Sequence, residues 1–396
     1  MASRRNFLRN SAFLVGGAMA SAHLVNAFPF KREPLKVGVI GTGSRGKGLM
    51  NLIQGMEGME VVACADIIPF RLEEAKAMGD KIKGYQDHRG VIDDKNVEAV
   101  IIATPFSTHD EIAIEALDAD KHIYCEKTMV KGMDEIQKVL DKANASNKVF
   151  YTGHQYRSSP VYQKVRQIIK SGYIGDITSV ECQWNRNADW RRPVPDPKWE
   201  RMINWRMYRE YSGGLVAELL SHQMDFINWF TDSHPSRISG FGGIDFWKDG
   251  RETFDNVHVL FEYPNGMDAS FMSTTSNAHE GFEMKILARK ATIVLRFDKG
   301  EIFTESLTDV EKGIVDGVSG ATLKTWQEGK GVPILGADKD PTIEALNDFY
   351  ESVVYQEEPI SSVKSGAVAA KCVQISLDAL YDGEVKHWSD YPELNM

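Results

Sequence analysis

A glycine-rich turn near the N-terminus constrains the fold more than any other feature of the sequence. The turn Gly41-Thr42-Gly43-Ser44-Arg45-Gly46 lies between a predicted strand, 35–40, and a predicted helix, 44–54. This is the context that a dinucleotide-binding fingerprint requires. Gly41 permits the tight turn, Gly43 lets the backbone approach a pyrophosphate, and Gly46 lets helix and strand pack closely. The helix N-terminus adds free N–H groups and a positive dipole end. The turn therefore predicts a nucleotide-binding βαβ unit.

The second half of this fingerprint is also present. Asp66 follows the second predicted strand, 59–65, about 20 residues beyond Gly46. A carboxylate at this position binds both ribose hydroxyls and repels a 2′-phosphate, which favours NAD over NADP as the cofactor. Arg45 and Arg71 keep NADP as an alternative, because either guanidinium can reach a 2′-phosphate. FAD is a further, less favoured alternative.

Strands and helices alternate as far as residue 155. Further strands are predicted at 98–104, 122–125 and 149–152, and further helices at 69–78, 108–118 and 133–145. The strand at 98–104 is entirely apolar over its central part, as in a parallel sheet that is buried on both faces. Repeated β-α-β units predict a doubly wound parallel sheet, so we expect an α/β dinucleotide-binding domain over 35–155.

The carboxyl ends of two later strands add residues to the expected cofactor site, because ligands of such sheets bind at that edge. Residues after the third strand are Thr104, Pro105, Phe106 and His109, and those after the next strand are Glu126 and Lys127. Together with the turn residues 41–46 and Asp66, they form the predicted cofactor-binding set. Lys127 is expected to point toward the nicotinamide end of the cleft.

Residues 156–396 are predicted to form a second, α/β domain that binds substrate and carries the subunit contacts. A helix at 160–170 precedes strands at 177–184, 237–247, 257–263, 267–273, 282–288 and 292–297, which suggest one large, mostly antiparallel sheet. Residues 306–341 lack apolar periodicity and are expected to form a long surface excursion. Helices are predicted again at 342–355 and 365–381. We expect a homo-oligomer that assembles through the sheet.

A predicted helix at 215–230 begins after Gly213-Gly214 and carries three ionisable residues. Spacings of four and three place Glu218, His222 and Asp225 on one helix face. Such groups are costly to bury without a purpose, which suggests a site, although a solvated helix face has the same pattern.

The chain resembles the Gfo/Idh/MocA oxidoreductases over essentially its whole length after residue 27. The resemblance rests on Gly41-x-Gly43-x-x-Gly46, on Glu126-Lys127-Thr128, and on Gly213-Gly214 with His222 and Asp225. It implies a Rossmann domain, an open-sheet C-terminal domain, and action on sugars or polyols with a nicotinamide cofactor. It also implies that Lys127 and His222 are catalytic. Thr128 replaces the family's usual proline, and Glu218 its usual aspartate.

The segment 183–211 is rich in tryptophan and arginine, which suggests how a sugar is bound. Flat rings suit the C–H faces of pyranoses and guanidinium groups suit hydroxyls or carboxylates. The predicted substrate-binding residues are Glu218, Asp225, His154, Arg157, Trp190, Trp205 and Arg206. A structural or subunit-contact loop is the alternative reading of this segment.

Oxidation of a secondary alcohol needs a base at the O–H group, which His222 provides, and Lys127 can stabilise alkoxide character on the same oxygen. Nothing in this scheme requires a metal, and no metal is expected. The favoured function is a nicotinamide-dependent oxidoreductase for a sugar, polyol or glycoside. An NAD-dependent glycosidase, which oxidises, eliminates and reduces again, is the alternative. A non-catalytic sugar-sensing protein is the alternative of a different class.

Composition and the first residues bear on location. The formal net charge of -10 disfavours nucleic-acid binding. After residue 30 the sequence contains no apolar segment long enough to predict a membrane-spanning helix. Residues 1–27 resemble a twin-arginine export signal, with Arg4-Arg5 followed by Phe7-Leu8 and then an apolar run. Export predicts a periplasmic protein. Because free NAD is scarce there, it also predicts a cofactor that is loaded early, held tightly and regenerated within each cycle.

Overall fold

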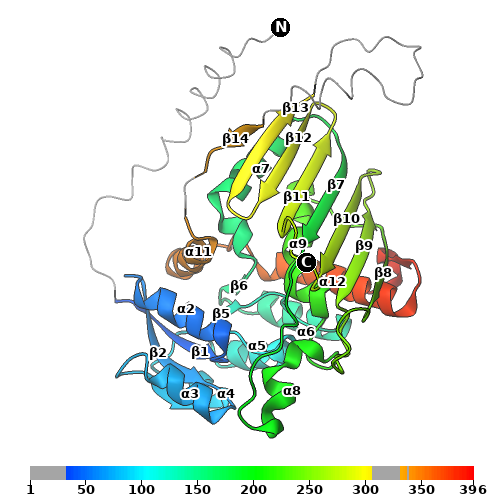
Figure 1. Ribbon diagram of the computed structural model, residues 1–396. Coiled ribbons are helices and arrows are strands. Elements are labelled where there is room, and N and C mark those ends of the chain that lie inside the picture. The colour runs from blue at the N-terminus through cyan, green and yellow to red at the C-terminus, as the bar shows by residue number, and fades with distance from the viewer. Residues whose placement is uncertain (1–32, 306–330, 337–338) are drawn as a thin grey trace, which may run out of the picture. The chain divides into compact units, whose positions relative to one another are not determined.

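The N-terminal half is built on a parallel sheet, as the alternating pattern predicts. A computed structural model describes residues 33–305, 331–336 and 339–396. Its first sheet has the strand order β3-β2-β1-β4-β5-β6, and each paired strand is parallel to its neighbour (Figure 1). Its strands are β1 (Leu35–Ile40), β2 (Met59–Ala65), β3 (Lys83–Tyr85), β4 (Ala99–Ile102), β5 (His122–Cys125) and β6 (Phe150–Thr152).

The strand order reverses between β1 and β4, which is where an open α/β sheet forms its ligand crevice. The covering helices are α2 (Ser44–Gln54), α3 (Pro69–Lys76), α4 (His88–Ile92), α5 (His109–Asp118) and α6 (Met133–Asn144). The predicted doubly wound sheet is therefore confirmed. The sequence reading missed β3 and α4, because each is too short to show a clear apolar period.

The second sheet has nine strands among the described residues, in the order β14-β13-β12-β11-β7-β10-β9-β8-β15. All its neighbours are antiparallel except β7 and β10, so it is mixed but mostly antiparallel, as expected. Its strands are β7 (Ile177–Trp184), β8 (Arg237–Gly243), β9 (Asn256–Glu262), β10 (Asp268–Thr274), β11 (Phe282–Ala288), β12 (Ala291–Arg296), β13 (Lys299–Thr304), β14 (Val332–Ile334) and β15 (Lys386–His387).

Two parts of the second half differ from expectation. The predicted strand 237–247 ends at Gly243, and β13, β14 and β15 were not predicted. Of the expected surface excursion 306–341, residues 306–330 and 337–338 lie outside the described residues, whereas β14 pairs with β13 at the edge of the sheet. A three-residue strand that contains Pro333 carries no sequence signal of its own.

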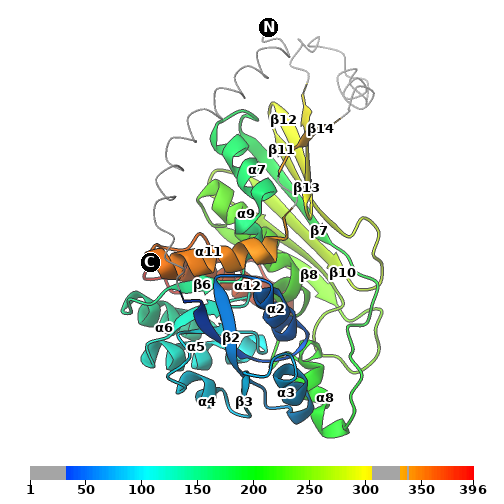
Figure 2. The same cartoon turned by 90° about the vertical axis from the view of Figure 1, so that its left-hand side faces the viewer.

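The helices of the second half connect the two sheets. They are α7 (Pro160–Lys170), α8 (Glu200–Ile203), α9 (Ser221–Thr231), α11 (Pro341–Tyr355) and α12 (Val363–Asp382). Phe349 of α11 belongs to the same buried core as residues of β1 and β2, and Ala367 of α12 belongs to the core that contains residues of α6. Figure 2 shows α11 and α12 next to the first sheet. Residues 35–396 form one compact unit. The sequence range 156–396 is thus not separate in space, because these two helices complete the cores of the first domain.

The predicted helix 215–230 is not uniform. Residues Val216–Leu220 form one turn of π-helix, and a regular helix, α9, begins at Ser221. Such single wide turns leave backbone carbonyls free for other donors and are common at functional sites. Nearly the whole segment is buried, so the alternative of a solvated face is excluded.

Candidate active site

The glycine-rich turn has the geometry that its residues predict. Gly41 has a φ of 88°, and a Cβ atom there would lie 2.7 Å from the carbonyl oxygen of Ala103. A Cβ on Gly46 would lie 1.9 Å from the carbonyl oxygen of Gly41, so only glycine fits. A Cβ on Gly43 would meet nothing closer than 3.6 Å, which leaves its backbone open to the cavity. The turn can therefore receive a pyrophosphate.

Asp66 is held in place at the end of β2. Its Oδ2 accepts hydrogen bonds from the backbone N–H of Thr42 at 2.8 Å and from Thr42 Oγ1 at 3.1 Å, and its Oδ1 accepts one from Ile68 N at 2.9 Å. Thr42 is fully buried and supports Asp66 rather than facing the cavity. Asp66 itself lines the cavity, so the carboxylate that is expected to bind the ribose lies where the fingerprint predicts.

A cavity of about 500 Å³ extends from this turn. Of the predicted cofactor set, it is lined by Gly41, Gly43, Ser44, Arg45, Asp66, Thr104 and Pro105. Its opposite wall comes from the second half of the chain: Arg192, Met202, Ile203, Trp205, Arg206 and Tyr211. Size and lining fit a dinucleotide. Sequence reasoning missed this wall because nothing in the pattern of residues 185–211, here called the covering loop, shows which way the loop folds.

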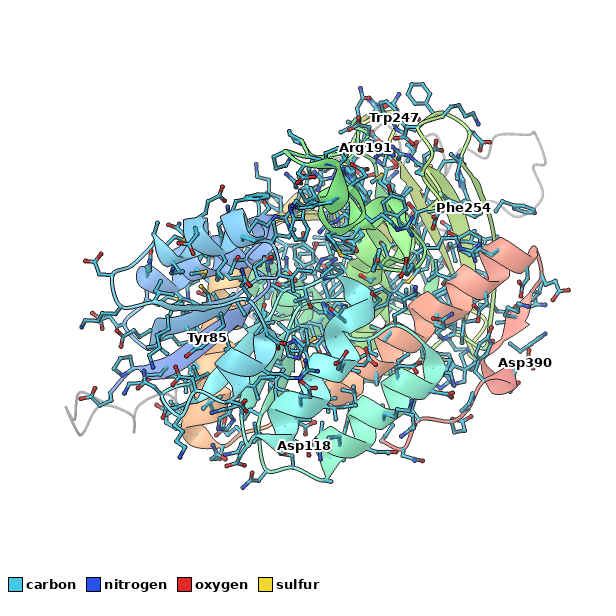
Figure 3. All side chains as sticks on the ribbon, turned by 90° about the horizontal axis from the view of Figure 1, so that it is seen from below. Tyr85, Asp118, Arg191, Trp247, Phe254 and Asp390 are labelled. Carbon is cyan, nitrogen blue, oxygen red and sulfur yellow. The ribbon has the colours of Figure 1, made fainter. Side chains whose placement is uncertain are left out.

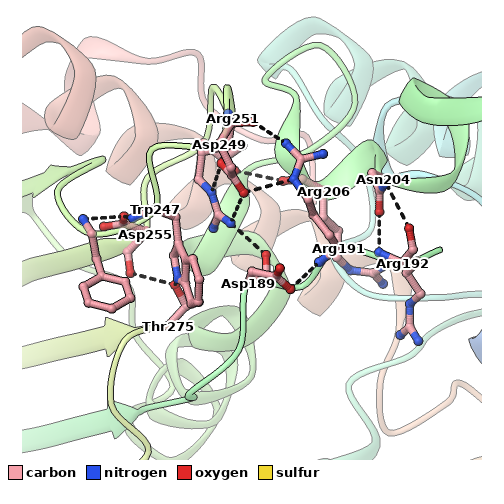
Figure 4. A network of polar contacts seen from close by, with 12 residues as sticks. Asp189, Arg191, Arg192, Asn204, Arg206, Trp247, Asp249, Arg251, Asp255 and Thr275 are labelled. Atoms are coloured by element: carbon pink, nitrogen blue, oxygen red, sulfur yellow. Dashed lines mark hydrogen bonds and ion pairs between the residues drawn. The ribbon is translucent and has the colours of Figure 1, made fainter. Parts of the chain in front are cut away.

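The covering loop is tied to the loop between β8 and β9 by a network of charged groups (Figure 4). Arg191 donates to Asp249 through Nε at 3.0 Å and to the Asp249 carbonyl at 2.8 Å. Arg251 donates to the Asp189 carbonyl at 2.8 Å and to the Asp249 carboxylate at 2.7 Å. The hydrogen bond from Arg251 holds the pKa of Asp249 well below its usual range. Figure 3 shows Arg191 and Trp247 at the same corner of the molecule.

A second cavity, of about 860 Å³, adjoins the first and shares Arg45, Thr104, Arg192, Trp205 and Arg206 with it. The remaining predicted cofactor residues at this junction are Phe106, His109, Glu126 and Lys127. Trp190 and Glu218 line the same space, together with Trp184 and Arg186. The predicted catalytic lysine and four of the predicted substrate residues therefore meet at one place: Trp190, Trp205, Arg206 and Glu218.

Arg45, one of the two arginines that kept NADP as an alternative, is paired with Glu126. Its Nε donates to Glu126 Oε1 at 2.7 Å. Burial disfavours its charge, but Glu126 outweighs this and raises the pKa of Arg45. Arg71 remains beside Asp66 in the first cavity. His109 is buried and fixed by backbone carbonyls, with contacts to Thr104 O and Thr128 O at 3.1 Å.

Lys127 is anchored by the π-helical turn. Its Nζ donates to the carbonyl of Glu218 at 2.9 Å, and Thr128 Oγ1 donates to the carbonyl of Ala217 at 3.0 Å. The Lys127–Thr128 peptide bond is cis. The threonine that replaces the family's proline thus gives this loop its own attachment to the helix. Burial lowers the pKa of Lys127.

Glu218 and Arg206 form an ion pair at 2.8 Å at the floor of the second cavity. Burial alone would favour the neutral acid, but Arg206 and Lys127 outweigh it and lower the pKa of Glu218. The pair therefore presents fixed charges, which are suited to hydrogen bonds with several hydroxyl groups.

His222 lies just beneath the cavity lining. It is 5% exposed, and its ring contacts Tyr156 and Trp184 at centroid distances of 5.0 and 5.6 Å. Burial, followed by Lys127, lowers the pKa of His222 well below its ordinary value. The imidazole is therefore neutral at pH 7, which is the form that accepts a proton.

Three predicted substrate residues lie deeper than expected. Asp225 is 2% exposed and accepts two hydrogen bonds from Arg157 at 2.8 Å, and His154 is 1% exposed beside them. None of the three lines either cavity. Helical spacing predicted that Glu218 and Asp225 share one face of the helix. Glu218 lines the second cavity, but Asp225 lies in the core, where Arg157 balances its charge.

Other chemistry-bearing groups do not form a second site. Cys64, Cys125, Cys182 and Cys372 are buried and free. Within the described residues, the one cluster with metal-ligating spacing is His88, Glu111 and Glu115, and Arg89 already pairs with both glutamates. No helix of the described residues is long and apolar enough to cross a membrane.

The fold and this cleft define a nicotinamide-dependent oxidoreductase. Two family models match in order along the chain: the oxidoreductase family with an NAD-binding Rossmann fold at residues 35–154, and the GFO/IDH/MocA C-terminal domain at 162–294. Together they cover more than half of the sequence. The chain belongs to the Gfo/Idh/MocA oxidoreductase family, its cofactor is NAD, and the resemblance read from its motifs is confirmed.

Several known proteins are similar to the chain. Myo-inositol 2-dehydrogenase of Thermotoga maritima is 22% identical, over 85% of this chain and 93% of its own length. Levoglucosan dehydrogenase of Pseudarthrobacter phenanthrenivorans is 25% identical, over 92% and 100%. A levoglucosan dehydrogenase structure with NADH and levoglucosan has a TM-score of 0.74 at 20% identity, covering 91% of this chain and all of that one. Aldose-aldose oxidoreductase of Caulobacter crescentus, complexed with glycerol, has a TM-score of 0.71 at 17% identity, covering 90% and 100%.

Proposed function

We propose that the protein oxidises a secondary hydroxyl group of a sugar, polyol or glycoside, and that its NAD(H) stays bound and is recycled within the catalytic cycle. The observation that carries the proposal is that Lys127 and the Glu218–Arg206 pair line the second cavity, while His222 lies beneath its lining, against the ring of Trp184. Relatives named as inositol and levoglucosan dehydrogenases support this substrate class.

The residues divide the work as follows. When bound, the nicotinamide supplies a two-electron hydride acceptor. The turn 41–46 and Asp66 would hold the dinucleotide, with Arg192 and Tyr211 covering it. His222 accepts the hydroxyl proton. Lys127 has three N–H donors; those not bonded to the carbonyls of Ala217 and Glu218 stabilise negative charge on the same oxygen. The Glu218–Arg206 pair and Trp190 bind the remaining hydroxyls and the ring face.

Retention of the cofactor is supported by the covering loop, which forms one wall of the first cavity. The charged network around Asp249 ties this loop to the loop between β8 and β9, and we expect this attachment to slow the release of a dinucleotide. Protein purified without added nucleotide should therefore release NAD or NADH when it is denatured by heat. An empty site, together with millimolar affinity for added NAD, would contradict retention.

We further propose that the protein is exported, on the twin-arginine pattern in residues 1–27, which lie outside the described residues. A retained cofactor and export support each other, because a periplasmic enzyme has little free NAD. A fusion of residues 1–27 to a reporter that folds in the cytoplasm should reach the periplasm, and Arg4→Lys with Arg5→Lys should keep it inside.

A second copy of the chain is proposed to pack on the large sheet. Side chains of β9 alternate between buried and exposed, and Leu260 on its outer face is 54% exposed, near Phe241 of β8 at 82%. Apolar side chains of this size on an open sheet face suit a partner surface.

The reaction class is tested with a panel of sugars and glycosides, each with and without a keto-sugar acceptor. The proposal predicts a stable ketone product whose accumulation depends on the acceptor. Release of the aglycone without any acceptor, with solvent hydrogen entering the carbon next to the oxidised one, would instead establish the glycosidase reaction.

A further inference from the structure

A group of buried polar atoms without partners lies directly behind His222. His154 is 1% exposed, and neither of its ring nitrogens has a hydrogen-bond partner. Nδ1 of His222 is also buried and has no partner. The two rings meet edge to face with centroids 5.8 Å apart. Buried polar atoms are almost always hydrogen-bonded, so several such atoms side by side call for an explanation.

The ion pair between Asp225 and Arg157, next to His154, indicates which nitrogen of His154 carries the proton. Asp225 is fixed by Nε and Nη2 of Arg157, and Arg157 also donates to the carbonyl of Ile360 at 3.2 Å. Nδ1 of His154 lies 3.9 Å from Oδ1 of Asp225. A carboxylate oxygen has more than one acceptor site, so Asp225 favours the tautomer of His154 that carries its proton on Nδ1. Nε2 of His154 is then an acceptor.

The groups packed around His154 and His222 can be named. Tyr156 and Trp184 cover the other sides of the His222 ring. The charged groups that face His154 are Asp225, Arg157, Lys127 and Glu126, and those that face His222 are Lys127 and Arg45. Burial, with Arg157 and Lys127, lowers the pKa of His154 to about 4 although Asp225 opposes this. Both rings are therefore neutral at pH 7, and each has one donor and one acceptor nitrogen.

We propose that His154 is a positioning residue for His222: one internal water joins the Nδ1–H of His222 to Nε2 of His154, and Nδ1–H of His154 faces Asp225. A water at this place would have polar partners on two sides, as buried waters require. The arrangement fixes the His222 tautomer, because the proton on Nδ1 leaves Nε2 free as an acceptor. This inference rests on the proposed function of His222 as the base.

The proposed hydrogen bonds from His222 through the water to His154 can also take up the proton that the reaction releases. When Nε2 of His222 accepts the hydroxyl proton, its Nδ1 proton moves toward the water and Nε2 of His154. The two rings and the water then share one added proton, with Oδ1 of Asp225 3.9 Å from Nδ1 of His154. During the reverse half-reaction the same proton returns by the same route. A retained cofactor that gives back its hydride needs such a returnable proton.

The first test reads the tautomer directly, without substrate. Nitrogen-15 NMR of the histidine rings in the full-length protein at pH 7 should show His222 protonated on Nδ1. His154→Phe should remove this preference, and His154→Leu gives the same test if the larger ring does not fit. His154→Asn keeps a hydrogen-bond acceptor and should restore the tautomer. Tyr162→Phe is the matched control, since it removes another unpartnered buried group nearby and should leave the tautomer unchanged.

The second test is kinetic. His154→Phe should lower kcat at least tenfold while KM changes less than twofold, and His154→Asn should recover most of kcat. A folded His154→Phe or His154→Leu variant with the wild-type tautomer and wild-type kcat would overturn the proposal. That result leaves the base assignment intact as long as His222→Ala is inactive. If His222→Ala retains turnover, the proposed function itself fails, whatever the tautomer shows.

Discussion

At the scale of single residues, the cleft depends on a few side chains whose protonation states are set by burial and by fixed partners. Arg206 and Lys127 hold Glu218 in its charged form, burial lowers the pKa of Lys127, and burial together with Lys127 disfavours the cation of His222. The motifs predicted these three positions. They did not predict that Asp225 and Arg157 would pair in the core, because only the fold shows which charged groups face each other.

Loss of the base should abolish turnover without loss of the fold. His222→Gln and Lys127→Met should each lower the rate of hydride transfer by about 10²–10⁴, the usual contribution of a positioned acid or base. Lys81→Met, which changes an exposed lysine on the loop after α3, is the control and should behave as wild type. Stopped-flow absorbance of the nicotinamide measures the rate, and a His222→Gln variant at near wild-type rate would refute the assignment.

The pH profile follows from the buried imidazole. The proton-accepting form of His222 is lost only as the pH falls through its pKa, which burial places well below the about 6.5 of an ordinary histidine. The acid limb of the kcat profile should therefore lie below pH 6.5, where an exposed histidine would already be half protonated. An acid limb centred at or above pH 6.5 would mean that another group is the base.

The choice between NAD and NADP is expected to depend on Asp66. Asp66→Asn removes the negative charge that repels a 2′-phosphate, so the preference for NAD over NADP should fall by tenfold or more, given that tenfold corresponds to about 1.4 kcal/mol. Binding titrations of both nucleotides to protein freed of its cofactor measure the ratio. Asp80→Asn, on a loop after α3, serves as the control. An unchanged ratio in Asp66→Asn would place the ribose elsewhere.

At the scale of elements, the covering loop and the π-helical turn decide how the site is assembled. Apart from β3 and α4, which are too short to show a period, the regular elements of the first domain follow from the sequence to within a few residues, because each has a clear period and a turn at its ends. The π-helical turn does not, since Val216–Leu220 has no pattern that distinguishes it from a regular helix. In this wide turn the backbone carbonyls of Ala217 and Glu218 accept hydrogen bonds from the side chains of Lys127, Thr128 and Ser221.

The charged network is expected to control release of the cofactor. Arg251 is almost fully buried and joins the covering loop to Asp249, so Arg251→Met leaves Asp249 with one fewer partner. Breaking a buried pair costs about 3–5 kcal/mol, and the dissociation rate of NADH should rise at least about tenfold. Arg237→Met, which removes an exposed ion pair with Glu262, is the matched control. Equal release rates in both variants would show that the loop does not retain the cofactor.

At the scale of the whole molecule, the cleft lies where two sheets and a shared set of helices meet, and a second copy of the chain is proposed to pack on the outer face of the large sheet. Figure 2 shows α7 and α9 on one side of this sheet. Neither the joint core formed by α11 and α12 nor the closing wall of the cavity follows from sequence periodicity, since both are contacts between segments far apart in the chain.

The assembly is tested by light scattering. The wild-type protein should have at least twice the mass of one chain, and Phe241→Glu combined with Leu260→Glu should reduce it to one chain, because paired charges on the open face repel a second copy. Phe70→Glu, an apolar to acidic change on α3, should leave the mass unchanged. A wild-type protein that is monomeric at high concentration would contradict the proposed contact.

Oxidation of a sugar by a retained nicotinamide can be followed in the absorbance of the protein's own cofactor during one turnover. Purified protein, with no nucleotide added, is mixed with sugars and glycosides while the absorbance near 340 nm is followed. We expect a substrate to raise the absorbance by up to one equivalent of NADH per site, and a keto-sugar then to reverse it without any free nucleotide. A bound nicotinamide that no sugar, polyol or glycoside reduces, in protein whose His222 and Lys127 are intact, would contradict this expectation.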